Sequence, residues 1–185
     1  MSERYKAQYE FITSHGTRVM LTSHFKFERA TLEQKFNAEL GGGKPICNGC
    51  GPSGYGWLVP DSILGVVVTI CGHIHNWSYQ FGIDREDKMV ADETFGDNLD
   101  RLIRADYAHD LHMEELRYAL AIRDAGWLGK KWENYVHQRK LGYLKEMFDT
   151  RITLAEQAYE KAVRVWGKSA FWDKRKIGFT LNDVG

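Results

Sequence analysis

The chain has 185 residues, of which 43% are hydrophobic and 13% aromatic, enough to bury one sizeable core. Its 25 basic and 25 acidic side chains balance, so no overall field attracts nucleic acid or an anionic membrane. The first ten residues lack the apolar segment of a secretory signal, and the longest apolar run, 63–71, is too short to cross a bilayer. We therefore expect a folded, soluble protein that is cytoplasmic as synthesised.

The N-terminal part predicts a small β-hairpin followed by a short helix. Residues 5–29 alternate roughly between apolar and polar side chains, with a turn at His15 and Gly16. A capping pair at positions 31 and 34 then opens a brief helix, which ends at three consecutive glycines. The next stretch, 44–60, is rich in glycine and proline and predicts a binding loop with exposed backbone groups.

A helix is predicted over residues 63–80. Because this segment is rich in β-branched side chains, a buried strand over residues 66–70 is the competing interpretation. On a helix, residues four apart share a face, so Cys71, His75 and Tyr79 form one stripe. This spacing directs a histidine toward the protein interior.

A second amphipathic helix is predicted over residues 87–104, after a turn at 81–86. We expect it to lie antiparallel to the first helix and to present Asp92 toward His75. Its expected inner positions are Val90 or Ala91, followed by Phe95, Leu99 and Leu102. The two helices together predict a His/Asp site.

The C-terminal half predicts a helical hairpin. Residues 105–125 and 131–166 carry apolar stripes at helical spacing, separated by the glycines of the sequence GWLG. Leu116 and Leu120 belong to the first stripe, and the second begins at Tyr135 and is expected to serve internal packing or a subunit interface. The tryptophans of this half suit an interface or a lipid-facing surface.

The expected fold class is mainly α, in three parts. An N-terminal β-hairpin and short helix cover residues 1–43, a core with the helix pair covers 44–104, and a helical extension covers 105–185. The last residues, 173–185, are expected to form a loosely held tail.

Three motifs of the central part, C-G-P-x-G-x-G, C-x-x-x-H-N-x-x-Y and A-D-x-x-F-x-x-x-L, resemble the secreted phospholipase A2 superfamily. The chain is most similar to members without the full disulfide set, including the phospholipase domains of viral capsid proteins. The resemblance covers residues 47–103. It implies a glycine-rich calcium loop, an antiparallel helix pair and hydrolysis of a phospholipid carboxylic ester.

The resemblance also implies roles for individual residues. His75 would activate the water that attacks the ester, Asp92 would orient His75, and Tyr79 would hold Asp92 in place. The backbone carbonyls of the loop would bind calcium through Gly51, Gly54 and Gly56.

Asn76 is the main departure from the family pattern, because it stands where the family has a calcium-binding aspartate. An amide in place of a carboxylate removes a negative charge and one ligand oxygen, so weak or absent calcium binding is expected. The alternative function is therefore a catalytically silent scaffold in a phage or another assembly. The expected partners of the protein are a phospholipid surface or further copies of the chain, contacted through the C-terminal helices. The protein is expected to be released from the cell or associated with a particle.

The cysteines support a second alternative. Cys47 and Cys50 form a C-x-x-C knuckle, and Cys71 with His73 or His75 would complete a zinc site. Three cysteines are too few for a disulfide framework. No phosphate-binding, dinucleotide-binding or nucleic-acid motif is present in the sequence.

Overall fold

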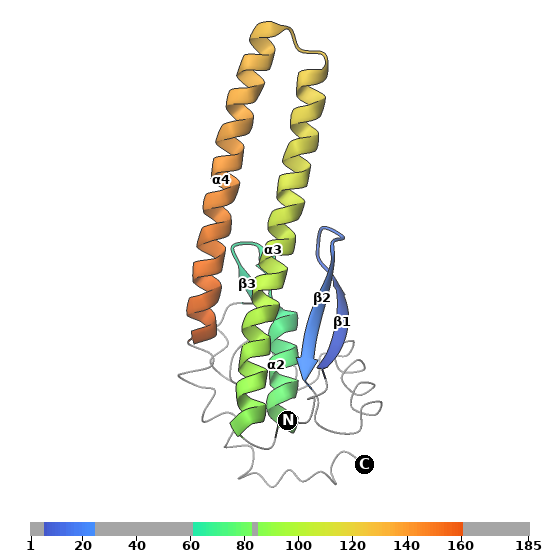
Figure 1. The fold of residues 1–185 in the computed structure, drawn as a ribbon, viewed down its shortest axis with the longest axis vertical. Helices are drawn as coiled ribbons and strands as arrows, with labels where there is room; N and C mark the ends of the chain where they lie inside the picture. Colours follow the sequence, from blue (N-terminus) through green and yellow to red (C-terminus); the bar gives the residue numbers. More distant parts are fainter. Residues whose placement is uncertain (1–5, 25–60, 83–84, 161–185) are drawn as a thin grey trace.

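The computed structural model describes residues 6–24, 61–82 and 85–160, and these residues are mainly helical (Figure 1). Two short antiparallel strand pairs accompany the helices. The predicted helix after position 31 and the predicted binding loop at 44–60 lie outside the described residues. The part beyond position 160 also lies outside them.

The N-terminal hairpin is confirmed. Strand β1 (Lys6–Ile12) pairs antiparallel with β2 (Arg18–His24), and Ile12 lies opposite Arg18 in the register. The connecting turn contains Gly16 with φ of 78°, a left-handed conformation that glycine adopts without steric cost.

The start of the first predicted helix was wrong. Residues 62–67 form a second hairpin of β3 (Ser62–Ile63) and β4 (Val66–Val67), and helix α2 (Thr69–Phe81) begins only at Thr69. The turn between the strands places Leu64 and Gly65 at φ of 45° and 90°, values that no right-handed helix contains. The competing strand interpretation was therefore correct for Val66 and Val67.

The two helices expected over 87–104 and 105–125 are one continuous helix, α3 (Arg85–Arg123). No proline or glycine stands near position 104, so nothing in the local sequence ends the helix there. Three residues connect α3 to α4 (Trp127–Glu160), which runs back antiparallel to it. The predicted C-terminal hairpin is confirmed, although α4 begins before its expected start at 131.

The hydrophobic core lies where α2, the lower part of α3, the end of α4 and both strand pairs meet (Figure 1). Of the predicted inner positions of α3, Phe95, Leu99 and Leu102 are buried and pack with residues of the other elements, including Leu21, Ile74 and Ala155. Ala91 is also buried, in a separate cluster with Tyr79. Farther along the hairpin, Leu116, Leu120 and Tyr135 are exposed, so these members of the stripes do not pack inside the hairpin. The seam there is formed by other side chains, among them Glu114 and His137.

Asn98 attaches the N-terminal hairpin to α3. Its side chain is fully buried, and its amide accepts a hydrogen bond from the Thr22 nitrogen at 2.9 Å and donates one to the Thr22 oxygen at 2.7 Å. Arg101, one turn along α3, donates to the Met20 oxygen at 3.0 Å. These bonds satisfy backbone groups of β2 that β1 leaves unpaired.

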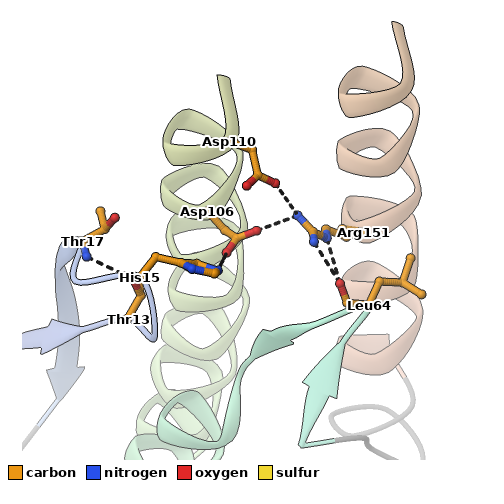
Figure 2. Close-up of polar contacts among 7 residues, drawn as sticks. All are labelled: Thr13, His15, Thr17, Leu64, Asp106, Asp110 and Arg151. Atoms are coloured by element: carbon orange, nitrogen blue, oxygen red, sulfur yellow. Dashed lines mark hydrogen bonds and ion pairs between the residues drawn. The ribbon is translucent and has the colours of Figure 1, made fainter. Parts of the chain in front are cut away.

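Arg151 joins the long hairpin to the rest of the molecule (Figure 2). Its guanidinium donates to Asp106 Oδ2 at 2.7 Å and to the Leu64 oxygen at 2.9 and 3.2 Å. His15 Nε2, from the first hairpin, lies 3.4 Å from Asp106 Oδ1. Both hairpin turns, α3 and α4 thus meet around the ion pair of Asp106 and Arg151.

In the part of the chain that the model describes, no helix is both long enough and apolar enough to cross a membrane.

Replacing Asn98 with alanine is expected to lower the free energy of unfolding by about 2 to 4 kcal/mol, because two buried backbone groups lose their partners. Chemical denaturation measures this change. Asn134→Ala, at an exposed position of α4, is the control and should leave stability almost unchanged. Equal effects of the two substitutions would contradict the role assigned to Asn98.

Candidate active site

The helix pair brings His75 and Asp92 together. Helices α2 and α3 run antiparallel (Figure 1), and the two buried side chains contact each other from neighbouring helices. His75 Nε2 lies 3.1 Å from Asp92 Oδ1, and the two residues are only 8% and 5% exposed. The predicted contact between the histidine and the aspartate is therefore present.

Tyr79 binds the same carboxylate oxygen. Its hydroxyl donates to Asp92 Oδ1 at 2.5 Å, and its ring centroid lies 4.1 Å from that of His75. Burial, and then the hydrogen bond to Asp92, raise the pKa of Tyr79 above its usual range. Tyr79 therefore remains protonated and acts as a fixed donor to Asp92.

Lys88 completes the group around Asp92. Its ammonium donates to Asp92 Oδ2 at 2.6 Å from one turn earlier on α3, and it lies 5.5 Å from the centroid of the Tyr79 ring. Lys88 was not among the residues expected at the site. Its spacing of four residues from Asp92 could have indicated an ion pair on α3, but most such pairs are exposed and have no functional role.

Asp92 is held in its charged form. Burial alone would raise the pKa of Asp92, but hydrogen bonds from His75, Lys88 and Tyr79 outweigh burial and lower this pKa below its usual range. Because the carboxylate accepts, the Nε2 atom of His75 carries the proton. The other ring nitrogen, Nδ1, is then the one that can accept a proton.

Packing fixes the orientation of the His75 ring. The ring contacts Phe95, with 4.9 Å between centroids, and Phe95 itself is 2% exposed. On α2, the hydroxyl of Ser78 bonds the Ile74 oxygen one turn back at 2.9 Å, so Ser78 is occupied within its own helix. The imidazole is thus positioned by one carboxylate and two aromatic rings.

The described residues contribute little to a calcium site. Asn76 is half-buried beside His75 and offers a neutral amide oxygen, whereas calcium binds six to eight oxygens and its affinity rises with their charge. Gly51, Gly54 and Gly56 lie outside the described residues. The donors that can be placed do not by themselves fit calcium.

Of the residues expected to bind zinc, the structure describes Cys71, His73 and His75. Cys71 is fully buried, and His75 is already bonded to Asp92. Cys47 and Cys50 lie outside the described residues. Within the described ranges, no group of three or more histidine, cysteine or acidic side chains is placed to hold a metal ion.

Comparisons of this chain with protein-family models, with curated proteins and with solved structures gave no match.

Replacing Lys88 with methionine is expected to lower the free energy of unfolding by about 1 to 3 kcal/mol at neutral pH, because Asp92 loses a buried charged donor. Folding lowers the pKa of Asp92, so its contacts stabilise the protein fully above the unfolded carboxyl pKa of about 4. That stabilisation is lost as the pH falls through the lower folded pKa. The difference between the two proteins should therefore shrink in acid.

Denaturation of both proteins at several pH values measures this difference. Lys145→Met is the matched control, because Lys145 bonds Asp149 at the same spacing of four residues but at an exposed site. This control should change stability little at any pH. A loss for Lys88→Met that is the same at every pH would contradict the role given to Asp92.

Proposed function

We propose that the protein hydrolyses a carboxylic ester of a phospholipid with His75 as general base and Asp92 as its orienting partner. The contact of 3.1 Å between His75 Nε2 and Asp92 Oδ1, buried and shared with Tyr79, carries this proposal. A histidine whose far nitrogen is fixed by a carboxylate is suited to remove a proton from water. The phospholipase A2-like sequence motifs supply the class of substrate.

The reaction begins when His75 Nδ1 accepts a proton from a water molecule whose oxygen attacks the ester carbonyl carbon. The tetrahedral intermediate collapses with cleavage of the bond to the alcohol oxygen. The His75 imidazolium returns the proton to that oxygen, so a fatty acid and a lysophospholipid leave. General-base assistance of this kind contributes about 10² to 10⁴ in rate.

Asp92 remains ionised throughout and stabilises the imidazolium. Tyr79 and Lys88 position Asp92, since one donates to Oδ1 and the other to Oδ2. A buried carboxylate with donors on both oxygens has little freedom to rotate. The dyad is therefore held in its working geometry before substrate binds.

Calcium, when bound, would polarise the ester carbonyl and stabilise the oxyanion. The sequence resemblance assigns it to the carbonyls of Gly51, Gly54 and Gly56 and to Asn76. Because Asn76 brings no charge, we propose that calcium binds weakly or not at all.

A catalytically silent scaffold is the second candidate function. Asn76 favours it, because the substitution weakens the expected metal site without disturbing the helix pair. The large apolar side chains that α3 and α4 expose also favour it, since they suit contacts in an assembly.

Replacing His75 with alanine should abolish release of fatty acid from phospholipid vesicles, and Asp92→Asn should reduce it by at least about 10²-fold. Titration of the released acid measures the rate, and thermal denaturation checks that each variant folds. His73→Ala is the control, since His73 lies half-buried on the same helix but is not bonded to Asp92. Unchanged hydrolysis after loss of His75 would exclude the proposed mechanism, and no hydrolysis by the unaltered chain would favour the scaffold.

Replacing Asn76 with aspartate should raise calcium affinity, because the site gains a negative charge and a second oxygen. Titration calorimetry measures the affinity, and the exposed Asn134→Asp serves as control. No change would mean that the glycine-rich segment is not a calcium loop. Elemental analysis of the untreated protein completes the test, since stoichiometric zinc would support the cysteine site instead.

A further inference from the structure

The distal part of the long hairpin, residues 107–123 of α3 and 127–148 of α4, is here called the arm. It exposes large apolar side chains at positions where a hairpin of two helices has no second layer to cover them. Leu120 and Trp132 are 63% and 62% exposed, and Met113 and Tyr143 are 51% and 52% exposed. Exposed apolar groups of this size, close together, mark an interaction surface.

These four side chains lie on one face of the arm. Met113 and Tyr143 line the same groove between the helices. The groove has a volume of about 340 Å³, and Leu144 and Met147 also line it. Leu120 follows Met113 by seven residues, or two helical turns, and Trp132 precedes Tyr143 by eleven residues, or three turns. We call this the groove face.

The opposite face of α4 is mainly polar. Its exposed residues include Lys131, Asn134, Gln138 and Lys145, which recur at helical spacing. Trp127 is 69% exposed on that side, where Lys131 lies 4.1 Å from the centroid of its ring. The groove face therefore carries more of the exposed large apolar side chains than this polar face.

Ion pairs between the helices fix which residues of the arm lie level. Arg117 Nη1 bonds Glu133 Oε2 at 2.9 Å, and His137 Nδ1 lies 3.0 Å from Glu114 Oε1. Since the helices are antiparallel, each turn back along α3 matches one turn forward along α4. By this register Leu120 lies level with Trp132, and Asp110 lies level with Lys140.

We propose that the groove face binds the groove face of a second copy of the chain, and that the two arms form an antiparallel four-helix bundle. A two-fold axis parallel to the arms places α3 of one copy over α4 of the other at equal height. Leu120 then meets the partner's Trp132, and Asp110 meets the partner's Lys140. Apolar side chains thus face apolar ones, and an acid faces a base, on both sides of the axis.

The size of the groove face agrees with this assembly. The arm is about 25 Å long and two helices, or about 20 Å, wide, which gives roughly 500 Å² of projected surface. Two copies would bury about 1,000 Å² or more, the lower limit for a specific protein interface.

The charges on the groove face suit a second copy. The groove is lined by acidic Asp110 and Glu114 as well as basic Arg117, Lys140 and Arg151, so a two-fold pairing can set acids against bases. The geometry disfavours a bilayer. Leu120 lies 28 residues beyond Asp92 on one straight helix, about 42 Å away, so an arm inserted by its tip would hold the dyad far from that membrane.

Sedimentation velocity of the full chain over a range of concentrations tests the proposal, and a dimer is expected. Trp132→Lys should weaken the dimer at least about thirtyfold, because a large aromatic contact of the interface becomes a buried charge. Trp127→Lys is the matched control, with the same substitution at an equally exposed tryptophan on the polar face, and it should leave the dimer intact. A monomeric unaltered chain, or equal loss for both variants, would overturn the proposal.

A charge exchange tests the pairing in trans. Asp110→Lys and Lys140→Asp should each favour the monomer, because like charges then meet across the axis twice. Asp110 also lies 3.9 Å from Arg151 of its own chain (Figure 2), so thermal denaturation checks that Asp110→Lys remains folded. An equimolar mixture of the two variants should restore a dimer, since every pair is again opposite in sign. A pairing confined to one chain cannot produce this rescue, so a mixture that remains monomeric would overturn the proposal.

Vesicles of phosphatidylcholine with phosphatidylglycerol provide the competing outcome. If the unaltered chain is monomeric and sediments with these vesicles through Trp132, the face binds lipid and the dimer proposal fails. Loss of the dimer does not remove the His75 and Asp92 dyad, so the proposed hydrolysis stands or falls separately.

Discussion

The Asp92 carboxylate lies buried between α2 and α3 and accepts hydrogen bonds from His75 and Tyr79 of one helix and from Lys88 of the other. A buried carboxylate without partners costs several kcal/mol, so the two helices have to keep the register that supplies these donors. The same register fixes the His75 ring against Phe95. The geometry that suits a general base is thus a consequence of satisfying one buried charge.

A second buried carboxylate has the corresponding role at the junction with the arm. Asp106 receives Arg151 from α4 and lies near His15 of the first hairpin, while Arg151 also bonds the Leu64 oxygen of the second hairpin. These contacts hold α4 against α3 beyond the hydrophobic core. Helix α3 therefore carries part of the candidate dyad near its first residues and part of the groove face on its distal half.

The sequence predicted the part of the site that depends on local spacing. His75 and Tyr79 are four residues apart, so any helix through them places both on one face, and Asp92 was expected opposite. It did not predict the start of α2 at Thr69, because β-branched residues suit a buried helix and a strand almost equally well. Asn98 was also missed, since only its contact with the distant Thr22 distinguishes it from an ordinary polar helix residue.

The sequence by itself determined a mainly helical chain, its N-terminal hairpin and the stripe that carries His75, because these follow from the order of neighbouring side chains. Only the tertiary structure decided that Lys88 turns inward to Asp92 and that Leu120 turns outward. Both depend on which side of α3 is covered by α2 and α4. That choice is made by long-range packing in the core, where Leu99 of α3 lies in one cluster with Ile74 of α2 and Ala155 of α4, and no local pattern records it.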